Sequence, residues 1–279
     1  MTQLTNVICA VTGAMLALSA MAALSIKAGE PESAKRVLIV ADEFGPMQAL
    51  AEFLRADGGF EVRIIDQKDM PADAAPYHAV FQYIHGPMQD ATGKALAEYA
   101  EKGGRLVLLH HAVASARRNN PEFLRFLGIA ISPRDDPKTP WRVIEGIPYT
   151  LVNLQPRHYI TTHGVRYDRT VDYQPSDGPS AAGKFPAIDL ADTEVFLNQL
   201  FTDGRAKTVL LGFRVTDPKT GEVLMQDRAG WYKPAGKGWV FYFQPGHMAS
   251  DFRNRDFAQM ILNCLTWQPA MQAQGEGNP

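Results

Sequence analysis

Short apolar runs alternate with amphipathic stretches along the chain from residue 36 onward. Apolar, β-branched runs predict four strands, at residues 36–42, 60–66, 79–84 and 105–109. Apolar residues at three-to-four spacing predict helices at 46–56 and 90–102, and the second helix is followed by a glycine pair. Because strands separated by helices of this length pair in parallel with right-handed crossovers, the sequence predicts an α/β fold with a flavodoxin-like, doubly wound and mostly parallel sheet.

The remainder of the chain has two patterns. Residues 128–208 are interrupted repeatedly by proline, which predicts an irregular insertion over the strand ends. Within it we expect short strands at 142–145, 149–153 and 165–173, and a helical or part-helical stretch at 190–200. Residues 208–215 and 222–226 flank a turn-rich segment and predict a β-hairpin, followed by a buried strand at 238–243 and a helix at 252–267.

The N-terminal segment differs from the rest. Residues 7–26 carry no charge, and Ala20-Met21-Ala22 has the form that signal peptidase accepts. We therefore expect a signal peptide or N-terminal anchor at 1–28, a polar linker at 29–35, the folded domain at 36–268 and a polar tail at 269–279. Cleavage would place the protein in the periplasm or outside the cell, whereas retention of 7–26 would anchor it to a membrane.

Composition narrows the class of protein. The chain has 279 residues, of which 46% are hydrophobic, and its 28 Lys and Arg nearly balance its 30 Asp and Glu. These values describe a globular protein and exclude a disordered one. No basic block is present, so we expect no nucleic-acid partner. The two cysteines, Cys9 and Cys264, are too few for a disulfide framework.

Candidate chemistry gathers at the predicted strand ends, where ligands bind in open α/β sheets. Asp42 and Glu43 follow the first strand, and His85 follows the third. His110 and His111 follow the fourth strand, and Gly246-His247 follows the strand at 238–243. Each imidazole alone is more often structural, but their convergence on one edge predicts a polar site.

Several segments together resemble the ThuA-like (trehalose-utilisation) proteins, which have a class I glutamine-amidotransferase-like fold. The segments are GGRLVLLHHA at 103–112, RHYIT at 157–161, DTEVF at 192–196, AGW at 229–231 and GKGWVFYFQPGH at 236–247. The resemblance implies a role in carbohydrate use, in which the protein binds and converts a sugar or keto-sugar related to trehalose. Its expected partner is therefore a small carbohydrate.

The resemblance and the strand-end rule together suggest two groups of site residues. The expected catalytic residues are His110, His247, Glu194 and His158. The expected substrate-binding residues are His85, His111, Trp231, Tyr242, Gly246 and Asp251. Imidazole and carboxylate can act as general acid and base. Because the same groups also suit a divalent ion such as Zn, Mn or Fe, a metal is open and no other cofactor is expected.

Two other functions remain open at this point, and one is excluded. The domain can be a non-catalytic module that binds a carbohydrate or a protein, or a metal-dependent hydrolase or lyase. A glutamine amidotransferase needs a cysteine on the sharp turn after a strand. That turn reads Leu109-His110-His111-Ala112, so glutaminase chemistry is excluded.

Overall fold

The computed structural model describes residues 35–270 except 177, 179 and 205. The signal peptide or anchor expected at 1–28, nearly all of the linker and residues 271–279 of the tail lie outside the described residues. Within the described part of the chain, no helix is both long and apolar enough to cross a bilayer.

The described elements follow one another in an order that begins with alternating strands and helices and continues with long strands. They are β1 (Arg36–Ala41), α1 (Phe44–Ala56), β2 (Glu61–Ile65), the 3-10 turn η1 (Gln67–Asp69), β3 (Ala79–Tyr83), α2 (Asp90–Glu101), β4 (Arg105–Leu109), α3 (Ala112–Asn119), α4 (Pro121–Leu127), β5 (Ile129–Ile131), β6 (Arg142–Asn153), α5 (Tyr159–Thr162), β7 (Arg169–Tyr173), β8 (Gly183–Leu197), β9 (Gln199–Phe201), β10 (Thr208–Thr216), β11 (Val223–Ala235), β12 (Gly238–Phe243), α6 (Ala249–Arg253) and α7 (Arg255–Thr266).

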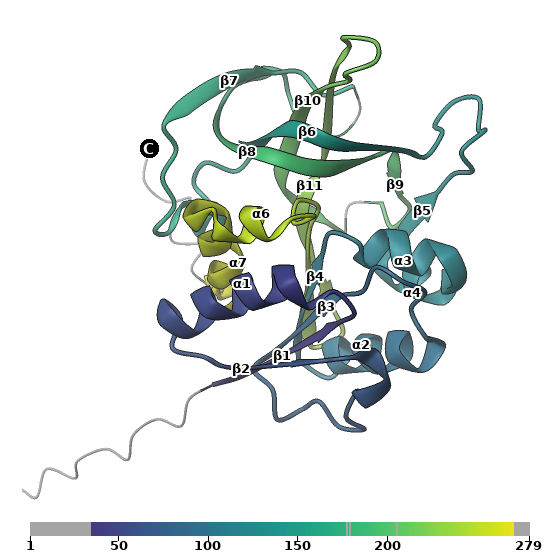
Figure 1. Ribbon diagram of the computed structural model, residues 1–279, viewed down its shortest axis with the longest axis vertical. Coiled ribbons are helices and arrows are strands. Elements are labelled where there is room, and N and C mark those ends of the chain that lie inside the picture. The colour runs from purple at the N-terminus through teal and green to yellow at the C-terminus, as the bar shows by residue number, and fades with distance from the viewer. Residues whose placement is uncertain (1–34, 177, 179, 205, 271–279) are drawn as a thin grey trace, which may run out of the picture. The chain divides into compact units, whose positions relative to one another are not determined.

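Ten of the described strands form one sheet in the order β2-β1-β3-β4-β12-β11-β10-β6-β8-β7 (Figure 1). The half from β2 to β12 is parallel, and the half from β12 to β7 is antiparallel. The parallel half confirms the predicted doubly wound α/β fold. β10 and β11 form the predicted β-hairpin, and β12 has the predicted bounds.

Helices cover both faces of the parallel half, because its strands are apolar on both sides. On one face, α1, α6 and α7 pack against strand residues such as Ile39 through side chains including Leu50 and Ile261. On the other face, α2, α3 and α4 pack against residues such as Val40 through side chains including Leu96. These two layers fix the edge at which the strands end.

The structure corrects two expectations for the middle of the chain. Residues 190–200 were expected to be helical or part-helical, but 190–197 belong to β8, which pairs with β6 in the main sheet, and 199–200 lie in β9. The segment is rich in residues that favour strands, such as Val195 and Phe196, and pairing with β6 overrides its local helical spacing. Most of the supposed irregular excursion is therefore the antiparallel half of the sheet, which brings Glu194 to the edge where β4 and β12 end.

Candidate functional site

His110 lies at the corner between β4 and α3. Its φ of 43° is in the left-handed region that residues with a Cβ seldom adopt, and its backbone N–H donates to the carbonyl of Phe243 at 2.8 Å. A strained residue on a strand–turn–helix corner presents the nucleophile in α/β-hydrolases. Here the same geometry presents an imidazole that is fully buried.

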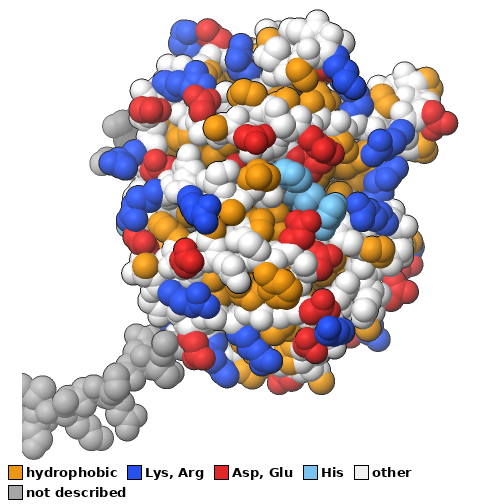
Figure 2. Space-filling model, in the orientation of Figure 1, with side chains coloured by type: hydrophobic (Ala, Val, Ile, Leu, Met, Phe, Trp, Pro, Cys, Tyr) orange, Lys and Arg blue, Asp and Glu red, His pale blue; other side chains and the backbone are white. Residues whose placement is uncertain are grey.

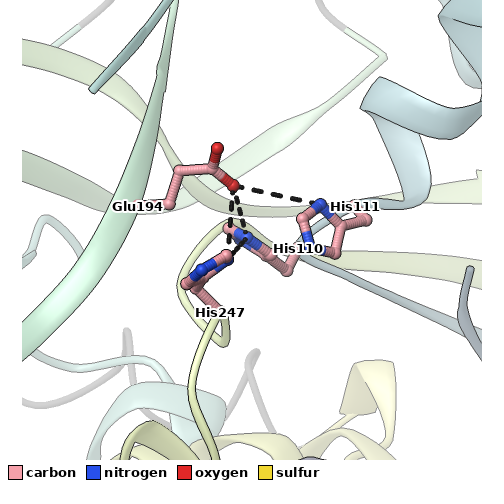
Figure 3. Close-up of side chains that lie close together, drawn as sticks. All are labelled: His110, His111, Glu194 and His247. Atoms are coloured by element: carbon pink, nitrogen blue, oxygen red, sulfur yellow. Dashed lines mark hydrogen bonds and ion pairs between the residues drawn. The ribbon is translucent and has the colours of Figure 1, made fainter. Parts of the chain in front are cut away.

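Four side chains meet at this corner, and we call them the His–Glu cluster: His110, His111, Glu194 and His247 (Figure 3). Nε2 of His110 lies 2.9 Å from Oε2 of Glu194 and 3.3 Å from Nδ1 of His247. The same Glu194 oxygen lies 3.5 Å from Nδ1 of His247 and 3.9 Å from Nδ1 of His111. One carboxylate oxygen is thus shared by three imidazoles from two different loops.

The electrostatics of the cluster follow from burial and from these contacts. Burial raises the pKa of Glu194, but hydrogen bonds with His110 and His247 outweigh it and lower that pKa to about 2. Burial, together with the neighbouring His110 and His85, lowers the pKa of His111 to about 2, so this imidazole is neutral. The hydrogen bond with Glu194 raises the pKa of His247, whose side chain is 33% exposed.

Hydrogen bonds to Asp251 hold the loop that carries His247. This buried carboxylate accepts hydrogen bonds from the backbone N–H of Gly246 at 3.1 Å, from that of Met248 at 3.3 Å and from Oγ1 of Thr193 at 2.7 Å. Gly246 has a φ of 124°, which suits glycine. Because Thr193 precedes Glu194 and Gly246 precedes His247, one carboxylate positions both functional side chains.

Glu43 and His85 form a second feature beside the cluster, which we call the outer pair. Nδ1 of His85 lies 2.8 Å from Oε1 of Glu43, and both side chains are partly exposed. Asp42 fixes their loop by accepting the backbone N–H groups of His85 and Gly86, each at 2.7 Å. Figure 2 shows that histidine side chains reach the surface here, with acidic side chains around them.

His111 connects the outer pair with the His–Glu cluster. Its ring stacks on that of His85 at 4.3 Å between centroids and meets that of His110 edge-on at 4.1 Å. Its Nε2 is buried, has no hydrogen-bond partner among the described residues and lies 3.9 Å from Oε2 of Glu43. A buried polar atom without a partner is rare and commonly marks a position where a ligand or water binds.

Seven of the predicted site residues meet at this edge: His85, His110, His111, Glu194, Gly246, His247 and Asp251. Tyr242 supports the site from inside the protein. It is fully buried, and its hydroxyl donates to the carbonyl of His110 at 3.3 Å and accepts from Nε2 of Gln199 at 3.2 Å, so its ring is not available to stack on a sugar.

Two predicted residues are not at this site. His158 caps α5: its Nδ1 accepts the N–H of Ile160 at 3.1 Å, and its ring packs against Trp267. Trp231 is fully buried in the core beside Phe201. Both side chains fill the interior away from the His–Glu cluster, so the structure gives no support to the catalytic role expected for His158 or to the substrate-binding role expected for Trp231.

The sequence did not single out two residues that the site uses. Glu43, noted only as a polar residue after the first strand, holds His85. The backbone carbonyl of Gln244 lies 2.6 Å from Nδ1 of His110. A backbone carbonyl leaves no signal in the sequence, whereas an acidic residue at the end of a parallel strand is a signal that a stricter use of the strand-end rule would have found.

The arrangement offers two groups of side chains that can hold a metal ion. One is the His–Glu cluster, and the other consists of Glu43, His85 and His111. The described cysteine, Cys264, is buried in α7, where burial raises the pKa of its thiol, so it takes no part in either group. The site is thus an imidazole and carboxylate centre at the carboxyl edge of a doubly wound sheet.

Comparisons with known proteins agree with this class of fold. Residues 36–268 match the ThuA family, described as trehalose utilisation, and the chain belongs to that family. Among curated proteins, no sequence matches the chain significantly.

Two solved structures of thua-like proteins have a similar fold. One, from Parabacteroides merdae, has a TM-score of 0.60 at 16% identity, with 84% of this chain and 89% of that chain covered. The other, from Bacteroides uniformis, has a TM-score of 0.56 at 16% identity, with 85% and 93% covered.

Proposed function

We propose that this chain binds a sugar or keto-sugar beside the outer pair and converts it by proton transfer. The proposal rests on Nε2 of His111. This atom is buried between the outer pair and Glu194 and has no hydrogen-bond partner among the described residues. A hydroxyl of a bound sugar would satisfy that atom and recover the cost of burying it, about 1–3 kcal/mol. The family description, trehalose utilisation, supplies the class of ligand.

The outer pair suits the role of a base. A carboxylate only accepts hydrogen bonds, so the contact with Glu43 places the proton on Nδ1 of His85 and leaves a lone pair on Nε2. This lone pair can take the proton from the carbon next to the keto group, and Glu43 then stabilises the imidazolium. Return of the proton to the opposite face of the same carbon completes an epimerisation. Return to the former carbonyl carbon, while the proton of the neighbouring hydroxyl passes to the former carbonyl oxygen, completes an isomerisation, and neither route needs a further reactant.

His85 suits this role better than His110, which the sequence favoured. Both nitrogens of His110 face oxygen atoms of the protein, the carbonyl of Gln244 and the carboxylate of Glu194. Its ring is also fully buried, whereas about half of the side chain of His85 is exposed. A base must reach the proton that it removes.

Proton exchange with solvent tests the proposal. The full chain is incubated in D₂O with trehalose-like disaccharides and their keto derivatives, and loss of the proton next to the keto group is followed by NMR. We expect His85→Gln and Glu43→Gln to slow the exchange by about 10²–10⁴-fold, the usual contribution of a general base. His163→Gln, at an exposed imidazole beside α5, is the matched control and keeps the activity.

Thermal shifts with the same sugars separate binding from conversion. Stabilisation by a sugar without proton exchange would show a non-catalytic binding module and refute the conversion. Neither stabilisation nor exchange with any sugar of the panel would refute the proposal as a whole.

Export is part of the same proposal. We base it on the uncharged segment 7–26 and on the Ala20-Met21-Ala22 sequence within it. N-terminal sequencing of the protein recovered from cells tests it, because cleavage after Ala22 or nearby is expected. An intact N-terminus in a membrane fraction would show an anchor instead.

A further inference from the structure

Three side-chain atoms of the His–Glu cluster lie so close together that a positive charge is needed among them. Nδ1 of His110 lies 2.6 Å from the carbonyl of Gln244, which can only accept, so this nitrogen carries the proton. In a neutral ring Nε2 then has a lone pair, and it faces Oε2 of Glu194 at 2.9 Å and Nδ1 of His247 at 3.3 Å. Nδ1 of His247 also has a lone pair when its proton lies on Nε2, and three lone pairs at such distances need a positive charge among them, which a proton or a metal ion can supply.

The spacing of these atoms fits a metal ion. Their separations are 2.9, 3.3 and 3.5 Å. A point about 0.9 Å off the plane of the three atoms lies about 2.1 Å from each of them, which is the length of Zn–N and Zn–O bonds. We infer that His110, Glu194 and His247 hold a divalent transition-metal ion of the Zn²⁺ class through these three atoms.

The surroundings of the three ligands are those of a built metal site. Metal-binding histidines almost always donate their other N–H to a carbonyl or carboxylate, as His110 does to Gln244. Phe196 stacks on the ring of His110 at 4.8 Å, and Asp251 holds the residues that precede Glu194 and His247. Three protein ligands leave positions open for water or substrate, as in catalytic rather than structural sites.

The other candidate group does not need an ion. The contact between Nδ1 of His85 and Oε1 of Glu43 is satisfied by a single N–H donor, so this pair is complete without an ion. The two groups therefore have separate roles, and the metal inference stands whether or not the chain acts on sugars.

Metal binding by the full chain, produced without a histidine tag, tests the inference. The protein is stripped with a chelator, and uptake of Zn²⁺ and Co²⁺ is followed by calorimetry, elemental analysis and the visible absorption of bound Co²⁺. We expect one ion per chain and no competition from Mg²⁺ at equal concentration, because imidazole ligands select transition metals over Mg²⁺. No sugar is present, so a failure here leaves the proposed function standing, and the reverse also holds.

Variants locate the ion. His247→Ala and Glu194→Gln should each weaken Zn²⁺ binding by about 100-fold or more, and Asp251→Asn, at a positioning residue, by about 10–100-fold while the Co²⁺ absorption keeps its shape. His85→Gln is the matched control and keeps wild-type affinity. Because His110 is buried, His247→Ala on the partly exposed loop carries the test even where a His110 variant does not fold.

Two results would overturn the inference. The first is a folded, metal-free chain, shown by its thermal transition, that takes up no stoichiometric Zn²⁺ or Co²⁺. The second is Zn²⁺ affinity that survives His247→Ala and Glu194→Gln but is lost in His85→Gln, which would place the ion in the other group.

Discussion

Replacing His158 with Asn should make the stability of the protein less sensitive to acid. Nδ1 of His158 accepts the N–H of Ile160, Nε2 lies 3.3 Å from the hydroxyl of Tyr232, and the ring is 2% exposed. Burial lowers the pKa of this imidazole from 6.5 to about 4. The folded protein therefore holds His158 neutral, and the unfolded chain protonates it first as the pH falls.

The magnitude follows from proton linkage. A group with a lowered histidine pKa contributes its full stability above pH 6.5 and loses it as the pH falls toward 4. Between pH 7 and pH 5 the wild-type chain should lose about 2 kcal/mol of unfolding free energy through this one group. An asparagine cannot take up a proton, and its side-chain oxygen can still cap the helix.

Urea denaturation followed by tryptophan fluorescence measures the effect. At pH 7 the Asn variant should be less stable by about 1–3 kcal/mol, because it loses the contact with Tyr232 and part of the packing on Trp267. At pH 5 this difference should shrink by about 2 kcal/mol. The same substitution at exposed His163 controls for removal of an imidazole.

One outcome would refute this reasoning. If the difference between wild type and variant stays constant within about 0.5 kcal/mol from pH 7 to pH 5, His158 is not held neutral by burial. A role in the interior would then be the wrong account of this residue, and its place in the chemistry would have to be reconsidered.

Two further predictions concern the loop that carries His247. Gly246→Ala should lower the unfolding free energy by more than about 1 kcal/mol, because the φ is 124° and a Cβ would lie 2.6 Å from Cζ of Phe252; Gly45→Ala, in open space on α1, should not lower it. Equal melting temperatures for the two variants would contradict this account. Asp251→Asn should cost about 1–3 kcal/mol in urea denaturation, since all three donors, among them Thr193, bind the one oxygen Oδ2, and an amide oxygen is a weaker acceptor than a carboxylate oxygen. An unchanged midpoint would show that the carboxylate does not hold the loop.

Local patterns were sufficient to predict the parallel half of the sheet. The strands at 36–41 and 105–109 are apolar on both faces, and the helices between them have amphipathic spacing, so burial and period point to the same elements. The spacing of residues 190–197 was ambiguous, and pairing with β6 made them a strand. Pairing between distant segments is set by the whole sheet and leaves no local signal.

For the candidate site, too, the sequence predicted one part and the tertiary structure decided the other. The rule that ligands bind at the carboxyl ends of parallel strands was enough to bring His85, His110 and His247 together, because each directly follows a strand. That rule alone did not place Glu194 among them; the family resemblance suggested it, and its actual position depends on β8 joining the antiparallel half. Nor did the sequence assign His158 to the interior, because burial of an imidazole depends on which side chains surround it. The sequence alone therefore determines the residue types and the strands that they follow. The distances that bring several lone pairs to one carboxylate oxygen are decided only by the folded sheet.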